Sequence, residues 1–92
     1  MDKLLASYGF NKKSDRLWIL NNGEEDILRV SLSYEIGFAW NSKSGNSEYR
    51  EWVVTVYERG GEFLTKAVMY APFKQFETRF IQHTKERKHW NI

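Results

Sequence analysis

The residues that could support acid–base or metal chemistry are two histidines and one run of carboxylates. His83 and His89 are six positions apart near the C-terminus, a spacing that does not place them on one helical face. The run Glu24-Glu25-Asp26 follows an Asn-Gly pair, and consecutive strand residues point to opposite faces, so these carboxylates do not converge. We therefore predict no metal, no cofactor and no catalytic residue. A small nuclease toxin that uses His83 as general base is the third of three possible functions, after protein binding and nucleic-acid binding.

Neither a nucleophile motif nor a phosphate-binding loop is present in the sequence. The serines lack the Gly-x-Ser-x-Gly pattern that exposes a nucleophile. Gly60-Gly61 is expected to form a hairpin turn, and no helix follows it to receive a phosphate. These absences favour a protein that is not an enzyme.

Length and composition predict one domain over residues 1–92 without a linker. The chain has no cysteine, which excludes disulfides and thiol catalysis. The first residues lack the apolar core of a signal peptide, and no window approaches the roughly 18 apolar residues of a membrane span. We expect a cytoplasmic protein without membrane association.

Charge is distributed unevenly along the chain. The net charge is +2, but residues 21–51 carry an excess of acidic groups and residues 52–92 an excess of basic ones. A basic helix that ends in an aromatic residue can follow a phosphate backbone and stack on a base. Binding of single-stranded DNA or structured RNA by the C-terminal helix is therefore the alternative to a protein-binding function. The residues expected to make this contact are Lys74, Arg79, Lys85, Arg87, Lys88 and Trp90.

Hydrophobic spacing predicts a helix at each end of the chain. Met1, Leu4, Leu5 and Tyr8 fall on one helical face, which indicates a helix over residues 2–8 that is capped by Gly9 and followed by Phe10. The last helix is expected to begin at Ala71-Pro72 and to run to about Arg87. Its inward side is expected to carry three phenylalanines with Ile81 beside them: Phe73, Phe76 and Phe80.

The order of helix, strands and helix resembles the topology of double-stranded-RNA-binding domains. The segment from Lys3-Leu4-Leu5 to Tyr8-Gly9-Phe10 is similar to the first helix of HicA-type toxins. Those toxins carry a histidine on their early strands, whereas the first histidine here is at position 83. The activity of HicA-type toxins, which depends on that early histidine, is therefore not expected of this chain.

Period-two patterns predict strands through the middle of the chain. Residues 11–15 are turn-like, 17–20 form a short strand, and Asn22-Gly23 marks a hairpin. Every even position from Leu28 to Trp40 is apolar or aromatic. This pattern predicts either one strand that bends at Gly37 or at Ser33-Tyr34, or two strands, with the even face buried. Residues 41–49 are expected to form a polar loop.

Residues 52–57 and 63–70 are expected to form a hairpin around Gly60-Gly61. A two-residue turn would pair Tyr57 with Leu64, Val53 with Val68 and Val54 with Ala67. Both faces of this hairpin are then apolar. The hairpin is therefore either covered on both sides or presents an apolar patch that could bind a partner, and the sequence does not decide between these two possibilities.

These elements predict an α+β fold in which one antiparallel sheet of four to five strands follows an N-terminal helix and precedes a C-terminal helix. The function we predict is non-enzymatic binding to a larger protein, as an inhibitor or modulator of the kind encoded by phages and mobile elements. A homodimer is possible. Aromatic residues and arginine are frequent anchors of protein interfaces. The predicted contact residues are Tyr49, Arg50, Val53, Tyr57, Arg59 and Leu64.

Overall fold

The computed structural model describes residues 1–21, 23–41, 45–59 and 65–86, with the backbone alone described at 39–41, 46 and 65. The described elements are α1 (Asp2–Ser7), β1 (Asn11–Ser14), β2 (Leu17–Asn21), β3 (Asp26–Asn41), β4 (Gly45–Arg59), β5 (Thr65–Pro72) and α2 (Phe73–Glu86). The strands form one antiparallel sheet in the order β1-β2-β3-β4-β5. The predicted α+β class with a helix at each end is confirmed.

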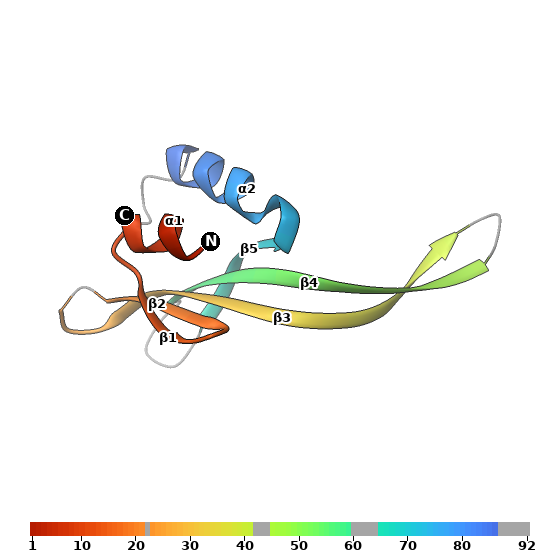
Figure 1. Ribbon diagram of the computed structural model, residues 1–92, viewed down its shortest axis with the longest axis horizontal. Helices are drawn as coiled ribbons and strands as arrows, with labels where there is room; N and C mark the ends of the chain where they lie inside the picture. Colours follow the sequence, from red (N-terminus) through yellow and green to blue (C-terminus); the bar gives the residue numbers. More distant parts are fainter. Residues whose placement is uncertain (22, 42–44, 60–64, 87–92) are drawn as a thin grey trace.

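Both helices lie on the same side of the sheet (Figure 1). The core is formed where α1 and α2 meet the inner halves of the central strands, with Leu5, Phe76 and Phe80 packed against Val30 and Val56. Phe80 makes edge-to-face contacts with Tyr8 and Phe10 at centroid distances of 5.3 and 6.2 Å. The body is therefore a two-layer sandwich of helices on a sheet, and neither of the two described helices lies on the other face of the sheet.

Helix α1 is short and is held at both ends by specific polar contacts. Gly9 has a φ of 92°, and the backbone N–H groups of Gly9 and Phe10 donate to the carbonyls of Ala6 and Leu5 at 3.0 Å. This is the predicted glycine cap, in which a left-handed residue satisfies the last carbonyls of a helix.

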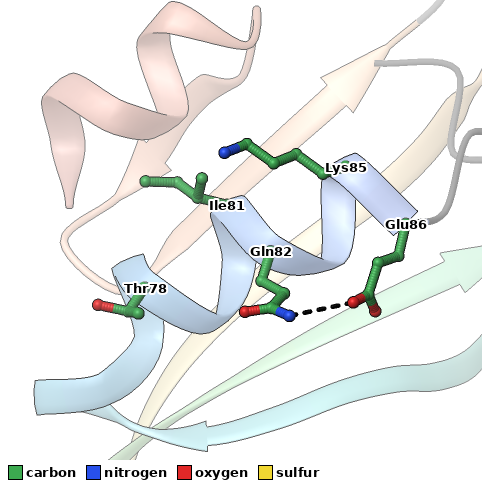
Figure 2. A pocket seen from close by; sticks show the side chains of 5 residues that line it. All are labelled: Thr78, Ile81, Gln82, Lys85 and Glu86. Atoms are coloured by element: carbon green, nitrogen blue, oxygen red, sulfur yellow. Dashed lines mark hydrogen bonds between the residues drawn. The ribbon is translucent and has the colours of Figure 1, made fainter.

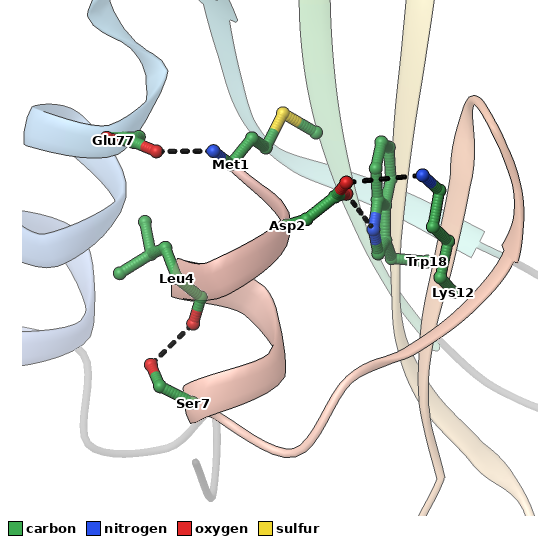
Figure 3. Close-up of polar contacts among 7 residues, drawn as sticks. All are labelled: Met1, Asp2, Leu4, Ser7, Lys12, Trp18 and Glu77. Atoms are coloured by element: carbon green, nitrogen blue, oxygen red, sulfur yellow. Dashed lines mark hydrogen bonds and ion pairs between the residues drawn. The ribbon is translucent and has the colours of Figure 1, made fainter.

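The start of α1 is tied to the sheet and to α2 (Figure 3). The indole Nε1 of the buried Trp18 donates to Asp2 Oδ1 at 3.0 Å, and Lys12 Nζ lies 3.2 Å from Asp2 Oδ2. The amino nitrogen of Met1 lies 2.6 Å from Glu77 Oε1 on α2. A helix of this length is not stable by itself in water, so these contacts and its apolar face hold it in place.

Three local expectations were wrong. Residues 11–14 form the edge strand β1 instead of a turn, because the backbone pairs with β2 although the side chains are exposed. Most of the expected loop at 41–49 is strand: β3 continues to Asn41, and β4 begins at Gly45, which has a φ of 79°. Helix α2 begins at Phe73, one residue after Pro72 ends β5, and Phe73 is exposed instead of inward.

The expected register of β4 and β5 was also wrong. Val53 pairs with Pro72, Val54 with Ala71 and Tyr57 with Ala67, with an irregularity between Val56 and Tyr57. Arg59 pairs with Thr65, so the connection is longer than two residues; Gly60-Gly61 and Leu64 lie outside the described residues. The face that the helices cover is the one with Val54, Val56, Met69 and Ala71.

Candidate functional site

The outer halves of β3 and β4 form a two-stranded arm that extends beyond the rest of the sheet (Figure 1). β3 and β4 pair from Leu28 and Glu58 out to Asn41 and Gly45. β2 pairs with β3 only as far as Ser31, and β5 pairs with β4 only from Val53 onward. Residues 33–41 and 45–52, here called the arm, therefore have no further strand beside them among the described residues.

One face of the arm is apolar along β3. Tyr34, Ile36 and Phe38 are 46, 57 and 72% exposed, and exposure rises toward the tip. They share a face with Leu28 and Val30, which are buried beneath the helices. The expectation that the whole even face is buried is therefore wrong: the same alternation that builds the core continues past the end of the helices into solvent.

The reason is a difference in length between the strands and the helices. A 16-residue strand spans about 53 Å, whereas the 14 residues of α2 span about 21 Å. Two short helices cannot cover both halves of such a strand. The surplus of even apolar positions over helical length is the signal in the sequence from which an exposed face could have been found.

The base of the arm is ordered by an aromatic contact. Tyr34 and Trp52 are cross-strand partners, with ring centroids 5.2 Å apart. The guanidinium carbon of Arg16 lies 4.8 Å from the Trp52 ring, at cation–π distance. The Arg16 carbonyl also accepts a 2.9 Å hydrogen bond from the N–H of Leu32. Tyr34, Trp52 and Arg16 thus form a cluster at the base of the arm, next to Ile36.

The opposite face of the arm is polar and is closed by Tyr70. The Tyr70 hydroxyl donates a 2.6 Å hydrogen bond to Glu35 Oε2. This hydrogen bond, burial and the negative charges of Glu35 and Glu51 raise the pKa of Tyr70 to about 12. Further out, Tyr49 lies over Gly37, where a side-chain carbon would stand 2.5 Å from the Tyr49 Cζ.

The predicted contact residues do not gather on one surface. Tyr49 and Arg50 are adjacent on β4 and so belong to opposite faces, and Arg50 Nε lies 2.9 Å from Glu48. Val53 is completely buried and offers no surface to a partner. Tyr57 is half-buried beside the guanidinium of Arg29, and Arg59 pairs with Glu25 at 2.8 Å.

The described basic residues of α2 are dispersed around the helix. Lys74, Arg79 and Lys85 are exposed, and the acidic Glu77 and Glu86 lie among them. The three cations follow one another at steps of five and six positions, which rotates Arg79 away from the other two by at least a third of a turn. Arg87, Lys88 and Trp90 lie outside the described residues.

In the part of the chain that the structure describes, two hollows border α2, and their described lining residues include no catalytic set. The larger, about 490 Å³, is an open depression whose described lining residues all belong to α2 (Figure 2), and in it Gln82 Nε2 donates to Glu86 Oε1 at 3.0 Å. The other, about 340 Å³, lies between α2 and β5 and includes His83 beside Arg79 and Tyr70. Among the residues that the structure describes, no three His, Cys, Asp or Glu side chains are grouped to hold a metal ion.

Comparison of the chain with protein-family models, with curated proteins and with solved structures finds no match. Within the described ranges, no helix has the length and apolar character needed to cross a membrane. Among the described residues, several large apolar side chains are exposed together on the apolar face of the arm, which is formed by Tyr34, Ile36 and Phe38 with Trp52 at its base.

Proposed function

We propose that this chain is a non-enzymatic binding protein that contacts a larger protein through the apolar face of the arm. The observation that carries the proposal is the rising exposure of Tyr34, Ile36 and Phe38 along one face of a strand whose inner half belongs to the core. Large exposed apolar patches mark interaction sites on soluble proteins.

Stability gives a second argument for a partner on this surface. A two-stranded ribbon is marginally stable in water unless a further layer covers one of its faces. The arm has the Tyr34–Trp52 contact at its base, but no helix or strand covers the face around Ile36 and Phe38 among the described residues. A partner that covered this face would remove Ile36 and Phe38 from water, the two most exposed large apolar side chains among the described residues.

The chemistry of the surface defines the partner. Tyr34, Ile36 and Phe38 occupy alternate positions of β3 and so lie in a row on one face of the arm. Glu48 and Arg50 lie beside them on the same face, on β4. An apolar centre bordered by charged groups is the usual composition of a protein interface. We therefore expect a shallow apolar groove or sheet face on the partner, with polar groups at its border that meet Glu48 and Arg50.

The test combines capture from the native host with two matched double variants. Ile36→Ser/Phe38→Ser removes apolar surface from the arm face, whereas Lys74→Ser/Lys85→Ser removes two exposed cations from α2 and is the control. Proteins retained by the wild-type chain are identified by mass spectrometry, and the affinity of the purified partner is then measured by calorimetry. We expect the arm variant to lose at least tenfold in affinity and the α2 variant to bind as the wild type does. Retention of nucleic acid alone, with loss in the α2 variant, would contradict the proposal.

A further inference from the structure

We infer that two copies of this chain associate through the open edge of β3 in the arm, antiparallel around a twofold axis at Gly37. This contact uses the strand edge, whereas the proposed partner contact uses the apolar face. The two proposals therefore stand or fall separately.

The first step is the direction of the backbone groups. The N–H of Leu32 donates to Arg16 on the β2 side, and the β2 partners of Val30 and Leu28 are Trp18 and Leu20. Backbone groups alternate between the two sides of an antiparallel strand. Tyr34, Ile36 and Phe38 therefore direct their N–H and C=O groups to the same side as Leu32, where β2 has ended.

The second step is that the described edges differ in how they are protected against pairing. Natural sheets protect edges with short strands, lysine and proline. β1 has four residues and carries Lys12 and Lys13, and β5 carries Lys66 and ends at Pro72. The arm segment of β4 carries the charged residues Glu48, Arg50 and Glu51.

The arm segment of β3 lacks this protection. Its single charged residue among positions 33–41 is Glu35, and Tyr70 holds that carboxylate by a 2.6 Å hydrogen bond. Tyr70 belongs to β5, on the far side of β4, so the carboxylate is drawn away from the open edge. Among the described residues, no strand pairs with the backbone groups on this edge and no charged side chain is directed along it.

The third step is that the edge is complementary to itself. An antiparallel pair centred on Gly37 uses the whole open segment, because position 33 then meets position 41 of the second copy. Ile36 meets Phe38, a β-branched residue opposite an aromatic, which is a favourable cross-strand pair. Glu35 meets Ala39, so no like charges stand opposite each other. Centring the pair on Glu35 instead would place two carboxylates face to face.

The arrangement also fits the apolar face. A twofold axis perpendicular to the sheet keeps the Tyr34, Ile36 and Phe38 faces of both copies on one side. Two apolar faces then lie next to each other on a continuous four-stranded surface, which exceeds the three strands usually needed for independent stability. The dimer thus stabilises the arm and leaves its apolar face open to a partner.

The test is sedimentation equilibrium of the full chain with a matched pair of charge variants. Ala39→Glu places a carboxylate opposite Glu35 twice in the dimer, and Ala39→Lys places an ammonium there. Within one chain, position 39 pairs with the uncharged Ser47 on β4, so a carboxylate and an ammonium at position 39 meet the same neutral partner in the monomer. We expect a monomer–dimer equilibrium that Ala39→Glu weakens and Ala39→Lys strengthens, each by about 2- to 20-fold, and less so at high salt. A chain that stays monomeric at millimolar concentration, or a dimer that responds equally to both variants, overturns the inference.

Two further variants test the edge and the register. Ile36→Pro removes an N–H that faces the open edge, while the bonds between β3 and β4 remain, and we expect a folded monomer. The chain has no cysteine, so Ser33→Cys/Asn41→Cys reports the register by oxidation to a covalent dimer. Within one strand these positions are about 26 Å apart and cannot bridge. Equal cross-linking of the single variant Ser33→Cys would exclude the Gly37-centred register, and a dimer unaffected by Ile36→Pro would exclude the β3 edge.

Discussion

The hydroxyl of Tyr70 on β5 donates a 2.6 Å hydrogen bond to Oε2 of Glu35 on β3, across the intervening strand β4. Tyr70 pairs with Thr55 and Glu35 with Glu51, so the line between them passes over Val53. Val53 is completely buried although it lies on the face without helices. The Tyr70–Glu35 contact therefore closes this part of the open face and places a polar bridge where the arm leaves the body.

The titration of Tyr70 tests this contact directly. Its pKa is raised to about 12 by the hydrogen bond to Glu35, then by burial and by nearby negative charge. Because the folded pKa lies above the ordinary value near 10, the stabilisation from this contact is fully present below pH 10 and is lost as the pH rises toward 12. We expect ultraviolet titration of the wild-type chain to show a phenolate near pH 12 that is absent in Tyr70→Phe. Identical titration curves of the two proteins in this range would contradict the contact.

Asp2 is expected to stabilise the body through the buried indole of Trp18. Asp2→Ala removes the acceptor of a 3.0 Å hydrogen bond and leaves the indole N–H without it. An unsatisfied buried donor costs about 1–3 kcal/mol of the free energy of unfolding. Asp2→Asn keeps an oxygen acceptor and is the control, with an expected loss of less than about 1 kcal/mol. Urea denaturation measures both variants; equal stability of Asp2→Ala and the wild type would show that the contact is not maintained in solution.

Two phenylalanines of the same helix provide a matched test of the core. Phe80 is fully buried among Tyr8, Phe10 and Phe76, whereas Phe73 is 46% exposed at the start of α2. We expect Phe80→Ala to lower the free energy of unfolding by about 3–5 kcal/mol, and Phe73→Ala by less than about 1 kcal/mol. Thermal and urea denaturation decide this. Similar losses in the two variants would mean that Phe73 faces the core after all.

Gly37 is expected to matter through Tyr49. A side-chain carbon at position 37 would stand 2.5 Å from the Tyr49 Cζ and hydroxyl, so Gly37→Ala must displace the ring. Because the ring end is free to move toward solvent, we expect a loss of less than about 1 kcal/mol, together with a shift of the Tyr49 ring resonances in NMR spectra. In a chain that already carries Tyr49→Ser, Gly37→Ala is expected to cause no further loss of the free energy of unfolding, because the ring that it would displace is gone. Unchanged Tyr49 resonances in Gly37→Ala would contradict the close approach.

Two of the elements that local patterns determine were predicted correctly. The helix at 2–8 was recognised from the spacing of Leu4, Leu5 and Tyr8, and its cap from Gly9. The strand through residues 28–40 was recognised from its period-two pattern, and the structure shows that it is one strand. These features depend on residues close together in the chain, so the sequence alone contains the information that defines them.

Features that depend on distant residues were predicted less well. The register of β4 and β5 was derived from a two-residue turn, but a longer connection shifts Val53 from Val68 to Pro72. The even-numbered side chains of residues 28–40 were predicted to be buried because apolar and polar residues alternate along this segment. This alternation identifies the apolar face of a strand, but not how much of that face two short helices can cover. For this reason, Ile36 and Phe38 were counted as core, and Val53, which is buried beneath Tyr70 and Glu35, was counted as surface.

Backbone hydrogen exchange of the chain, alone and in complex with its captured partner, tests the proposed contact most directly. We expect the partner to slow exchange at residues 33–38 of β3 and 47–52 of β4, because the apolar face of the arm becomes covered. Exchange in α2 is expected to remain unchanged. Slowed exchange confined to α2, with the arm exchanging as it does in the free chain, would contradict the account.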